Sequence, residues 1–317
     1  MIHCENSTPV KEFVLLGIPL SYQYQIPLFL LLSLCYFITI LGNATIIVVS
    51  LVNNQLHTPM YFFLSNLALL DISFTSAIVP KVLFNVISGS QTISFNGCLA
   101  QSYIYFLLGT TEFLLLAVMS FDRYIAICHP LRYRNIMSPK LSFQLIICSW
   151  VGGFMDTIVQ TILTFRLPFQ GSNVLNHYFC DVAPLLKLAC VNTHLIDMLD
   201  FILASSLVLG SLFFSLVSYG CIISAIVKIS STADRKKTFS TCASHLSVIF
   251  IVYGSCIFMC IRPYKNSKVD STKIVSLLNC ILTPLLNPFI YSLRNNTFKD
   301  ALRRTIRQSA LFANQKG

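Results

Sequence analysis

Seven long apolar stretches dominate this sequence and restrict what it can fold into. An α-helix rises 1.5 Å per residue, so about 20 apolar residues are needed to cross a hydrocarbon core of about 30 Å. Only 11% of the residues are charged, whereas a soluble domain carries roughly 25%. We therefore predict one all-α membrane domain over residues 1–317, a seven-transmembrane helix bundle. The predicted spans are residues 26–51, 60–79, 98–120, 141–163, 201–227, 239–261 and 274–293.

The chain has a formal net charge of +10, which fits either nucleic acid or anionic lipid as a partner. Its basic residues fall in short gaps between the apolar stretches and form no combined basic and aromatic surface, so we exclude nucleic acid. Of the 22 Lys and Arg residues, 14 lie in one set of loops and the C-terminal tail, and 8 lie in the other set. Because cytoplasmic loops keep the excess, we place residues 294–317 in the cytoplasm and residues 1–25 outside the cell.

Both ends of the chain carry features that agree with this orientation. Asn6 opens the tripeptide Asn6-Ser7-Thr8, an N-glycosylation acceptor that is usable only on the lumenal side. In the tail, Phe298, Leu302 and Ile306 recur every four residues among basic side chains. This pattern predicts a short amphipathic helix that lies on the anionic inner leaflet, with membrane lipids as its contacts.

Most of the 12 cysteines lie within apolar stretches, where a cysteine is usually a small packing residue. Cys98, at the outer end of the third span, and Cys180 and Cys190, in the loop before the fifth span, are among those that do not. Cys98 opens the third span, and Cys180 lies in the long loop before the fifth, so both face the oxidising side, where a disulfide persists. We predict a Cys98–Cys180 disulfide that holds this loop over the bundle.

Several polar residues lie deep inside predicted spans. A charged group at mid-membrane is costly, so Asp71 and Glu112 should face the bundle interior, with Asn43 and Asn287 as their partners. Such oxygen-rich clusters can bind a hydrated cation such as sodium, or they can form a hydrogen-bonded polar core without an ion. Both alternatives stay open, and we expect no other cofactor.

The inner end of the third span carries Asp122-Arg123-Tyr124, and the seventh span contains Pro284 and Pro288. The adjacent acid and Arg can form an ion pair that breaks on switching, the alternative being an Arg that extends to the membrane interface. The prolines each remove a backbone donor, which predicts a hinge.

Four segments, in this order over the seven spans, resemble the odorant receptors among the rhodopsin-like G-protein-coupled receptors. The resemblance runs over nearly the whole chain. The segments are residues 56–65 (LHTPMYFFLS), 119–128 (MSFDRYIAIC), 237–246 (KTFSTCASHL) and 286–295 (LNPFIYSLRN).

The resemblance implies a plasma-membrane receptor for small, mostly volatile molecules that couples to the olfactory stimulatory heterotrimeric G protein and raises cyclic AMP. It also implies that Cys98 and Cys180 match the family's bridge and that Tyr253 matches a toggle position in the sixth span. The implied G-protein switch consists of Asp122, Arg123, Tyr124, Tyr219 and Tyr291.

The chain departs from the family pattern in the loop between the fourth and fifth spans. The family usually has a further cysteine where this sequence has Gln170, and that cysteine pairs with the one matching Cys190. We therefore expect Cys190 to be free or to have another partner, and the loop to be less restrained.

The resemblance places the ligand among the outer halves of the third, fifth, sixth and seventh spans. Side chains there are mainly apolar and aromatic, which favours binding by burial and one or two hydrogen bonds. No acid lies between Cys98 and Thr111, so the usual counter-ion of an amine is absent and we expect an uncharged ligand. The predicted ligand residues are Tyr105, Phe106, Gly109, Thr110, Leu203, Ser206, Leu207, Tyr253, Cys256, Ile257, Cys260, Leu277 and Cys280.

Cys256 and Cys260, four residues apart, present two thiols of the kind that bind soft metals. Packing is the favoured interpretation, and we predict no metal site.

Three other functions are alternatives to an odorant receptor. A transporter or channel also uses buried acids and broken helices, but transporters often contain internal repeats, and none is visible here. An enzyme is not expected, because no Gly-x-Ser-x-Gly, His-Glu-x-x-His or phosphate-binding Gly loop is found. A receptor for a lipid or another hydrophobic messenger would share the scaffold and differ in its ligand.

Overall fold

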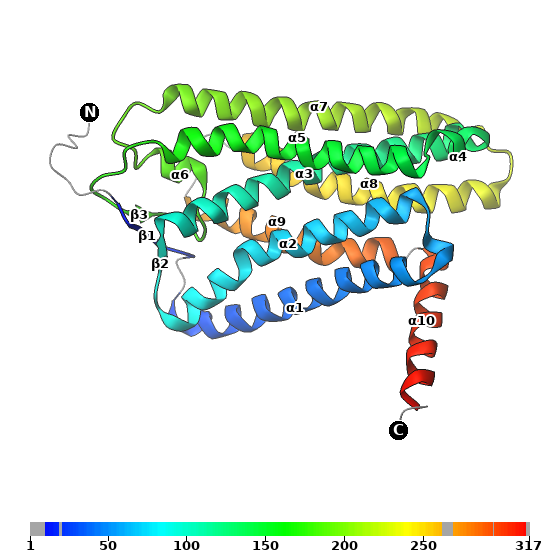
Figure 1. Ribbon diagram of the computed structural model, residues 1–317, viewed down its shortest axis with the longest axis horizontal. Coiled ribbons are helices and arrows are strands. Elements are labelled where there is room, and N and C mark those ends of the chain that lie inside the picture. The colour runs from blue at the N-terminus through cyan, green and yellow to red at the C-terminus, as the bar shows by residue number, and fades with distance from the viewer. Residues whose placement is uncertain (1–9, 19–20, 262–268, 294, 315–317) are drawn as a thin grey trace.

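The computed structural model describes residues 10–18, 21–261, 269–293 and 295–314. Seven long helices run lengthwise as one bundle (Figure 1), which confirms the predicted seven-helix fold. Six of them are long and apolar enough to cross a membrane, and α8 contains a shorter apolar segment, Cys242–Phe258. The seven helices are α1 (Tyr22–Val52), α2 (Pro59–Ser88), α3 (Phe95–Cys128), α5 (Pro139–Phe165), α7 (His194–Val227), α8 (Thr232–Ile261) and α9 (Val269–Leu293).

Most of these helices extend beyond the predicted spans, and the predicted ends at residues 79, 120, 201 and 239 each miss the end of the helix by seven to nine residues. α2 continues past Val79, through Pro80, to Ser88, and α7 already begins at His194. Hydropathy finds only the part of a helix that suits hydrocarbon, whereas the backbone hydrogen bonds continue the helix into polar surroundings.

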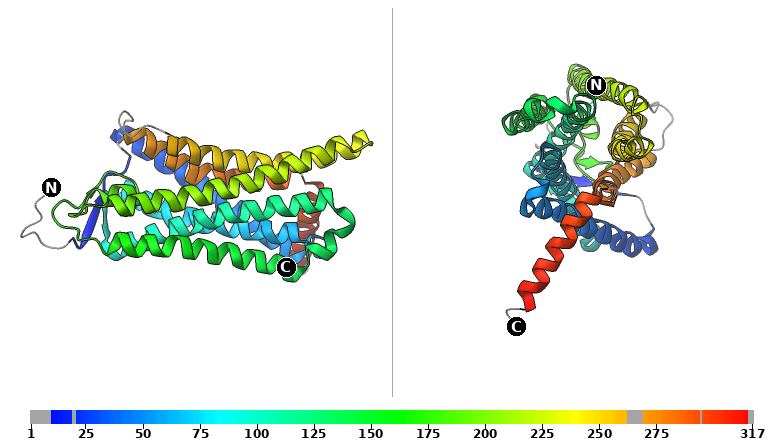
Figure 2. Two further views of the ribbon diagram at one scale, coloured as in Figure 1. Left: turned by 90° about the horizontal axis from the view of Figure 1, so that it is seen from above. Right: turned by 90° about the vertical axis from the view of Figure 1, so that its right-hand side faces the viewer.

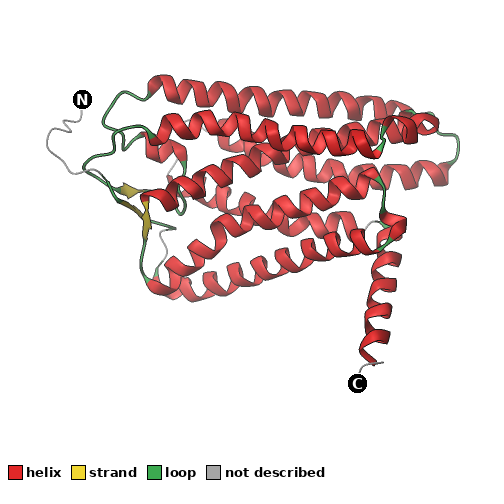
Figure 3. Ribbon diagram, in the orientation of Figure 1, coloured by secondary structure: helices red, strands yellow, loops and turns green. Residues whose placement is uncertain are grey.

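The two ends of the bundle carry different short elements (Figure 3). One end, the cap end, has a small sheet in the order β2-β1-β3, formed by β1 (Glu12–Leu15), β2 (Thr92–Ser94) and β3 (Val174–Leu175). β1 pairs antiparallel with β2 and parallel with β3, and α6 (Val182–Leu186) lies in the following loop. The other end, the tail end, has the short helices η1 (Asn54–Leu56), η2 (Pro130–Arg132) and α4 (Tyr133–Ile136), together with α10 (Asn296–Asn314).

The bundle has apolar side chains outside and polar groups inside. Phe250 is 80% exposed and Phe213 is 70% exposed, whereas Asn43 and Asp71 are 0% and 2% exposed. A water-soluble protein would not present such rings to solvent over much of its surface, but hydrocarbon accepts them. This distribution of apolar and polar side chains fits a bundle that is surrounded by lipid and whose few polar side chains face one another.

The cap end has a small core of its own around the predicted disulfide. Cys98 and Cys180 are bonded, with their Cα atoms 5.4 Å apart, and both are packed with Phe13 and Leu15 of β1. Cys190 is also disulfide-bonded, so the expectation of a free thiol is wrong and only another partner remains. The cap is therefore more firmly tied than the sequence suggested.

Lys273 of α9 joins the cap to the bundle. Its Nζ atom donates to Asn176 Oδ1 at 2.6 Å and to the carbonyl oxygen of Gly17 at 3.2 Å. Burial, together with the charge of Lys273, lowers the pKa of the nearby His177 to about 3, so this ring is neutral.

α10 leaves the bundle at its tail end and runs across the bundle axis (Figures 1 and 2). Phe298 is buried and stacks on Tyr61 of α2 at 6.4 Å, whereas Ile306 is 60% exposed. The predicted amphipathic C-terminal helix is therefore present, with its first turn fixed to the bundle.

Close packing of α3 on α5 depends on Gly153. A Cβ atom at this position would lie 2.3 Å from Thr111 Oγ1 and 3.1 Å from the backbone oxygen of Leu107. We expect Gly153→Ala to force the helices apart and to cost about 1–3 kcal/mol of folding free energy. The thermal midpoint of the purified protein measures this loss.

Gly152→Ala is the matched control, because its Cβ atom would meet only Leu114 Cδ1, at 2.8 Å, the far end of a flexible side chain. Equal midpoints for the two variants would contradict the assigned role of Gly153.

Candidate functional site

A cavity of about 230 Å³ lies within the bundle, lined mainly by α3, α5, α7, α8 and α9. Seven of the thirteen predicted ligand residues lie on its wall, from three different helices. They are Tyr105, Phe106, Gly109, Thr110, Leu203, Leu207 and Cys256.

Contacts between aromatic rings position the α3 wall of this cavity. The ring of Tyr105 lies 4.8 Å from Phe74, 5.2 Å from Phe106 and 4.5 Å from Phe179, measured between centroids. Phe179 directly precedes Cys180, so the disulfide that fixes the loop also fixes this ring against Tyr105. Ring pairs at such distances stabilise a particular arrangement beyond simple burial.

Five of the other predicted ligand residues are not on the described wall of this cavity. The Tyr253 hydroxyl donates to the carbonyl oxygen of Phe113 at 3.4 Å, while Leu277 and Cys280 are buried in the bundle core. Ser206 is exposed and bonds its own helix. Ile257 is half-buried, and the side chain of Cys260 lies outside the described residues.

α5 contributes a polar wall that the sequence analysis did not assign to the site. Asp156, Thr157 and Gln160 line the cavity together with Asp200 of α7. The Thr110 hydroxyl donates to Asp156 Oδ2 at 3.4 Å, and Gln160 Nε2 donates to Asp200 Oδ1. Asp156 lies within the predicted span 141–163, and an acid at this depth is expected to face the interior of the bundle.

The predicted polar core is only partly assembled. Asn287 Nδ2 donates to both carboxylate oxygens of Asp71, at 3.2 and 2.9 Å. Asn43 Nδ2 instead donates to the carbonyl oxygen of Pro284 at 3.0 Å, a carbonyl near the hinge prolines of α9. Glu112 lines the cavity, and its Oε1 atom has no hydrogen-bond partner among the described residues.

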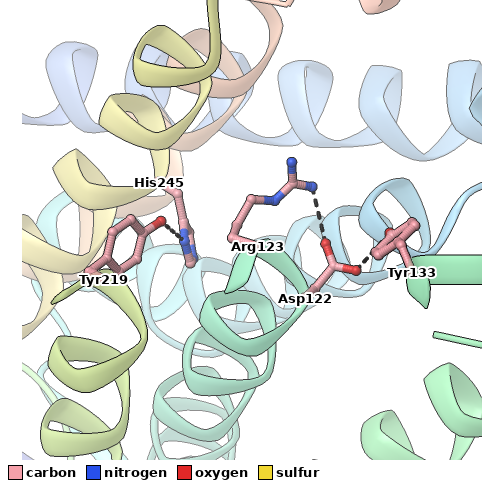
Figure 4. Close-up of polar contacts among 5 residues, drawn as sticks. All are labelled: Asp122, Arg123, Tyr133, Tyr219 and His245. Atoms are coloured by element: carbon pink, nitrogen blue, oxygen red, sulfur yellow. Dashed lines mark hydrogen bonds and ion pairs between the residues drawn. The ribbon is translucent and has the colours of Figure 1, made fainter. Parts of the chain in front are cut away.

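Two polar pairs lie at the tail end (Figure 4). Asp122 is 1% exposed, accepts a hydrogen bond from the Tyr133 hydroxyl at 2.9 Å and pairs with Arg123 at 3.2 Å. On the other side of Arg123, the Tyr219 hydroxyl lies 2.6 Å from His245 Nδ1. The predicted ion pair is therefore present, held by Tyr133, which the sequence analysis did not single out.

The remaining switch residues differ in their placement. Tyr291 lies beside Arg123 and His245 on a hollow of about 20 Å³, and its hydroxyl has no hydrogen-bond partner in the described part of the chain. Tyr124 lies 3.3 Å from His129 Nε2, measured from its hydroxyl oxygen, outside this group. His245 lies in the segment KTFSTCASHL, one of the four segments that carry the family resemblance. The sequence alone assigned no role to its imidazole ring.

Three helices connect the cavity with these pairs. α3 carries Thr110 and Arg123, α7 carries Leu207 and Tyr219, and α8 carries Cys256 and His245. At 1.5 Å per residue, Cys256 and His245 lie about 16 Å apart along α8. A shift or rotation of α8 at the cavity therefore reaches the Tyr219–His245 contact.

Comparison with known proteins gives a consistent result. The family pattern described as "Olfactory receptor" matches residues 32–309. Olfactory receptor 6E1 of Mus musculus is 50% identical over 309 residues, which cover 97% of this chain and 99% of that protein. Olfactory receptor 6J1 of Homo sapiens is 50% identical over 294 residues (93% and 85%), and olfactory receptor 6X1 of Homo sapiens is 46% identical over 301 residues (95% and 96%).

Proposed function

The chain belongs to the olfactory receptor family, and from this premise we propose that a small odorant held in the α3–α5–α7–α8 cavity makes it raise cyclic AMP through the olfactory stimulatory G protein. Its relatives are receptors, not enzymes, and family membership implies odorant detection through G-protein signalling. The chain is a multi-pass membrane protein. The ligand site, the second messenger and the identity of the G protein belong to the proposal.

The placement of the cavity carries this proposal. It is enclosed by the helices that also hold Arg123, Tyr219 and His245 at the tail end. A ligand stabilises one arrangement of such a bundle by its difference in affinity for the two arrangements. We propose that the favoured arrangement opens the tail end, so that the switch residues and the basic loops meet the G protein.

The proposal includes an orientation. The cap end faces outward, and the tail end, with α10 on the anionic inner leaflet, faces the cytoplasm of a cell whose plasma membrane holds the receptor. The excess of Lys and Arg in the loops and tail supports this placement. Asn6 lies outside the described residues, and its glycosylation stays a prediction.

We also propose that the polar core accommodates a hydrated sodium ion. Asp71 supplies a carboxylate, and Asn43 Oδ1 and Glu112 Oε1 are buried oxygens without a hydrogen-bond partner among the described residues. Hard oxygen ligands of this kind suit such a cation. A bound ion would offset the negative charge next to the hinge prolines of α9, whereas a core without an ion relies on Asn287 alone to satisfy Asp71.

The expectation of an uncharged ligand rests on the third span alone. The cavity also presents Glu112, Asp156 and Asp200, so the absence of an acid between Cys98 and Thr111 no longer decides the charge of the ligand.

Filling the cavity tests the proposed ligand site. Gly109 lines the cavity, and its nearest other side-chain atom is Phe74 Cε2 at 3.8 Å from a Cβ atom placed there. We expect the leucine side chain of Gly109→Leu to fill part of the cavity and to raise the half-maximal odorant concentration by roughly tenfold or more, because the ligand loses apolar contacts with the cavity wall. An odorant panel read out by cyclic AMP measures this shift.

Gly210→Leu is the control, because a Cβ atom on Gly210 has nothing within 4 Å and the residue does not line the cavity. Unchanged responses of Gly109→Leu at equal surface delivery would place the ligand elsewhere.

A further inference from the structure

We infer that the cavity binds a small protonated amine, whose ammonium group lies between Asp156 of α5 and Asp200 of α7. This inference rests on the proposed function, because it specifies the chemical class of the ligand in the same cavity.

The two carboxylates share one wall of the cavity. Gln160 follows Asp156 by one helical turn and donates to Asp200 Oδ1 across the α5–α7 contact. On the other side, Asp156 accepts from the Thr110 hydroxyl. A carboxylate offers about four acceptor positions, and these contacts occupy one on each acid. Both side chains therefore keep acceptor capacity toward the cavity.

The cavity contains acids without a matching base. Glu112, Asp156 and Asp200 line it, and no Lys, Arg or His is among its described lining residues. None of the three acids is in an ion pair within the part of the chain that the structure describes. Carboxylates at membrane depth are expensive unless a charge or several hydrogen bonds compensate them. A cationic ligand supplies the missing charge.

Glu112 also lacks a partner in the described part of the chain, and the proposed sodium ion and an amine are alternative partners for its Oε1 atom. Its Oε1 atom is buried and has no hydrogen-bond partner among the described residues, although the side chain lines the same cavity. An unpaired buried acceptor costs free energy that a ligand N–H recovers. The unmet hydrogen-bonding capacity thus extends from the α5–α7 wall to α3.

At the wall formed by Asp156 and Asp200, the side chains favour an organic cation over a metal ion. Metal ligands lie within about 2.0–2.6 Å of the ion, and no group of three His, Cys, Asp or Glu residues in the described ranges is placed to bind one. An ammonium group carries three N–H donors and tolerates more widely spaced acceptors. The rings of Tyr105, Phe106 and Phe113 on the cavity wall also suit a cation and its hydrocarbon tail.

The cavity volume limits the size of the amine. One water molecule needs about 10–15 Å³ of such a cavity, so the cavity of about 230 Å³ has room for a small organic molecule. An unbranched alkylamine such as hexylamine fits this limit. It is protonated at neutral pH, as a Lys side chain is with its pKa of about 10.4.

Hexylamine and hexan-1-ol form a matched pair of probes, since they have the same shape and differ in the charged group. We expect hexylamine to raise the thermal midpoint of the purified full-length receptor at concentrations at least roughly tenfold below those of hexan-1-ol, because charge-assisted hydrogen bonds are the stronger ones. This comparison needs no variant. Equal shifts, or a larger shift for the alcohol, overturn the inference.

Neutralising variants then locate the ammonium group. Asp156→Asn and Asp200→Asn should each weaken the hexylamine response by roughly tenfold or more and leave the hexan-1-ol response in place. Asn at position 200 keeps an oxygen for Gln160. Asp197→Asn is the control, because Asp197 is exposed on α7 and does not line the cavity. Retention of the hexylamine response in both cavity variants overturns the assignment.

Cyclic AMP measurements separate this inference from the proposed function. If hexylamine stabilises the receptor but does not raise cyclic AMP, the result supports the amine site and contradicts the proposed signalling. Neutral odorants that raise cyclic AMP, with no effect of hexylamine on stability, remove the amine site and leave the proposed function intact.

Discussion

Replacing Arg123 with Ala is expected to abolish ligand-dependent cyclic AMP production while the receptor still reaches the cell surface. Arg123 lies between the Asp122–Tyr133 pair and the Tyr219–His245 pair. Its loss leaves Asp122, which is 1% exposed, as a buried acid without its cation, and it removes the charge that the opened tail end would present. Cyclic AMP and antibody labelling of intact cells, measured in parallel, give the two readouts.

Arg134→Ala is the matched control, because Arg134 is an exposed arginine at the same end of the bundle. Tyr133→Phe adds an intermediate case, since it removes only the hydroxyl that donates to Asp122. Signalling by Arg123→Ala at the level of the Arg134→Ala control would reject the assigned role of Arg123.

Removal of the Cys98–Cys180 bridge is expected to lower both stability and ligand response. The bond closes a sequence separation of 82 residues, and loss of a disulfide of this kind typically costs about 2–5 kcal/mol. It also releases Phe179 from the ring of Tyr105 at the cavity wall. We expect the Cys98→Ala, Cys180→Ala double variant to unfold at a clearly lower temperature and to need more odorant for the same cyclic AMP signal.

Cys148→Ala controls for the loss of a thiol, because Cys148 is an exposed free cysteine of α5. A double variant that unfolds at the same temperature as Cys148→Ala would show that the cap holds without the bridge.

The sequence predicted the helices and several of their contacts because lipid imposes simple rules. Apolar length marks a span, and an acid inside a span must face a partner, which is why the sequence predicted the Asp71–Asn287 contact. The Cys98–Cys180 bond was predicted from the oxidising side that both residues face, a criterion that Cys190 also meets, and from the family resemblance.

The residues that line the cavity could not be predicted from the sequence by the same rules. An acid inside a span is expected to face the interior, but which neighbour Asp156 meets depends on how α5 is rotated about its axis. The contact of Gln160 with Asp200 depends on how α5 and α7 cross. These are properties of helix packing, set by close approaches such as that of Gly153 to Thr111. The strands of the cap were missed because they have only two to four residues, too short for a periodic pattern.

The strand order of the cap has a consequence for biosynthesis. β1 is translated first but occupies the centre of the sheet, so it must wait for β2 and then for β3 before its pairing is complete. The Lys273 contacts with Gly17 and Asn176 are added only after nearly the whole chain has been made. A nascent chain that stalls before α9 therefore has all three strands but lacks the Lys273 contacts that join the cap to the bundle, a difference by which folding surveillance can distinguish it from the finished receptor.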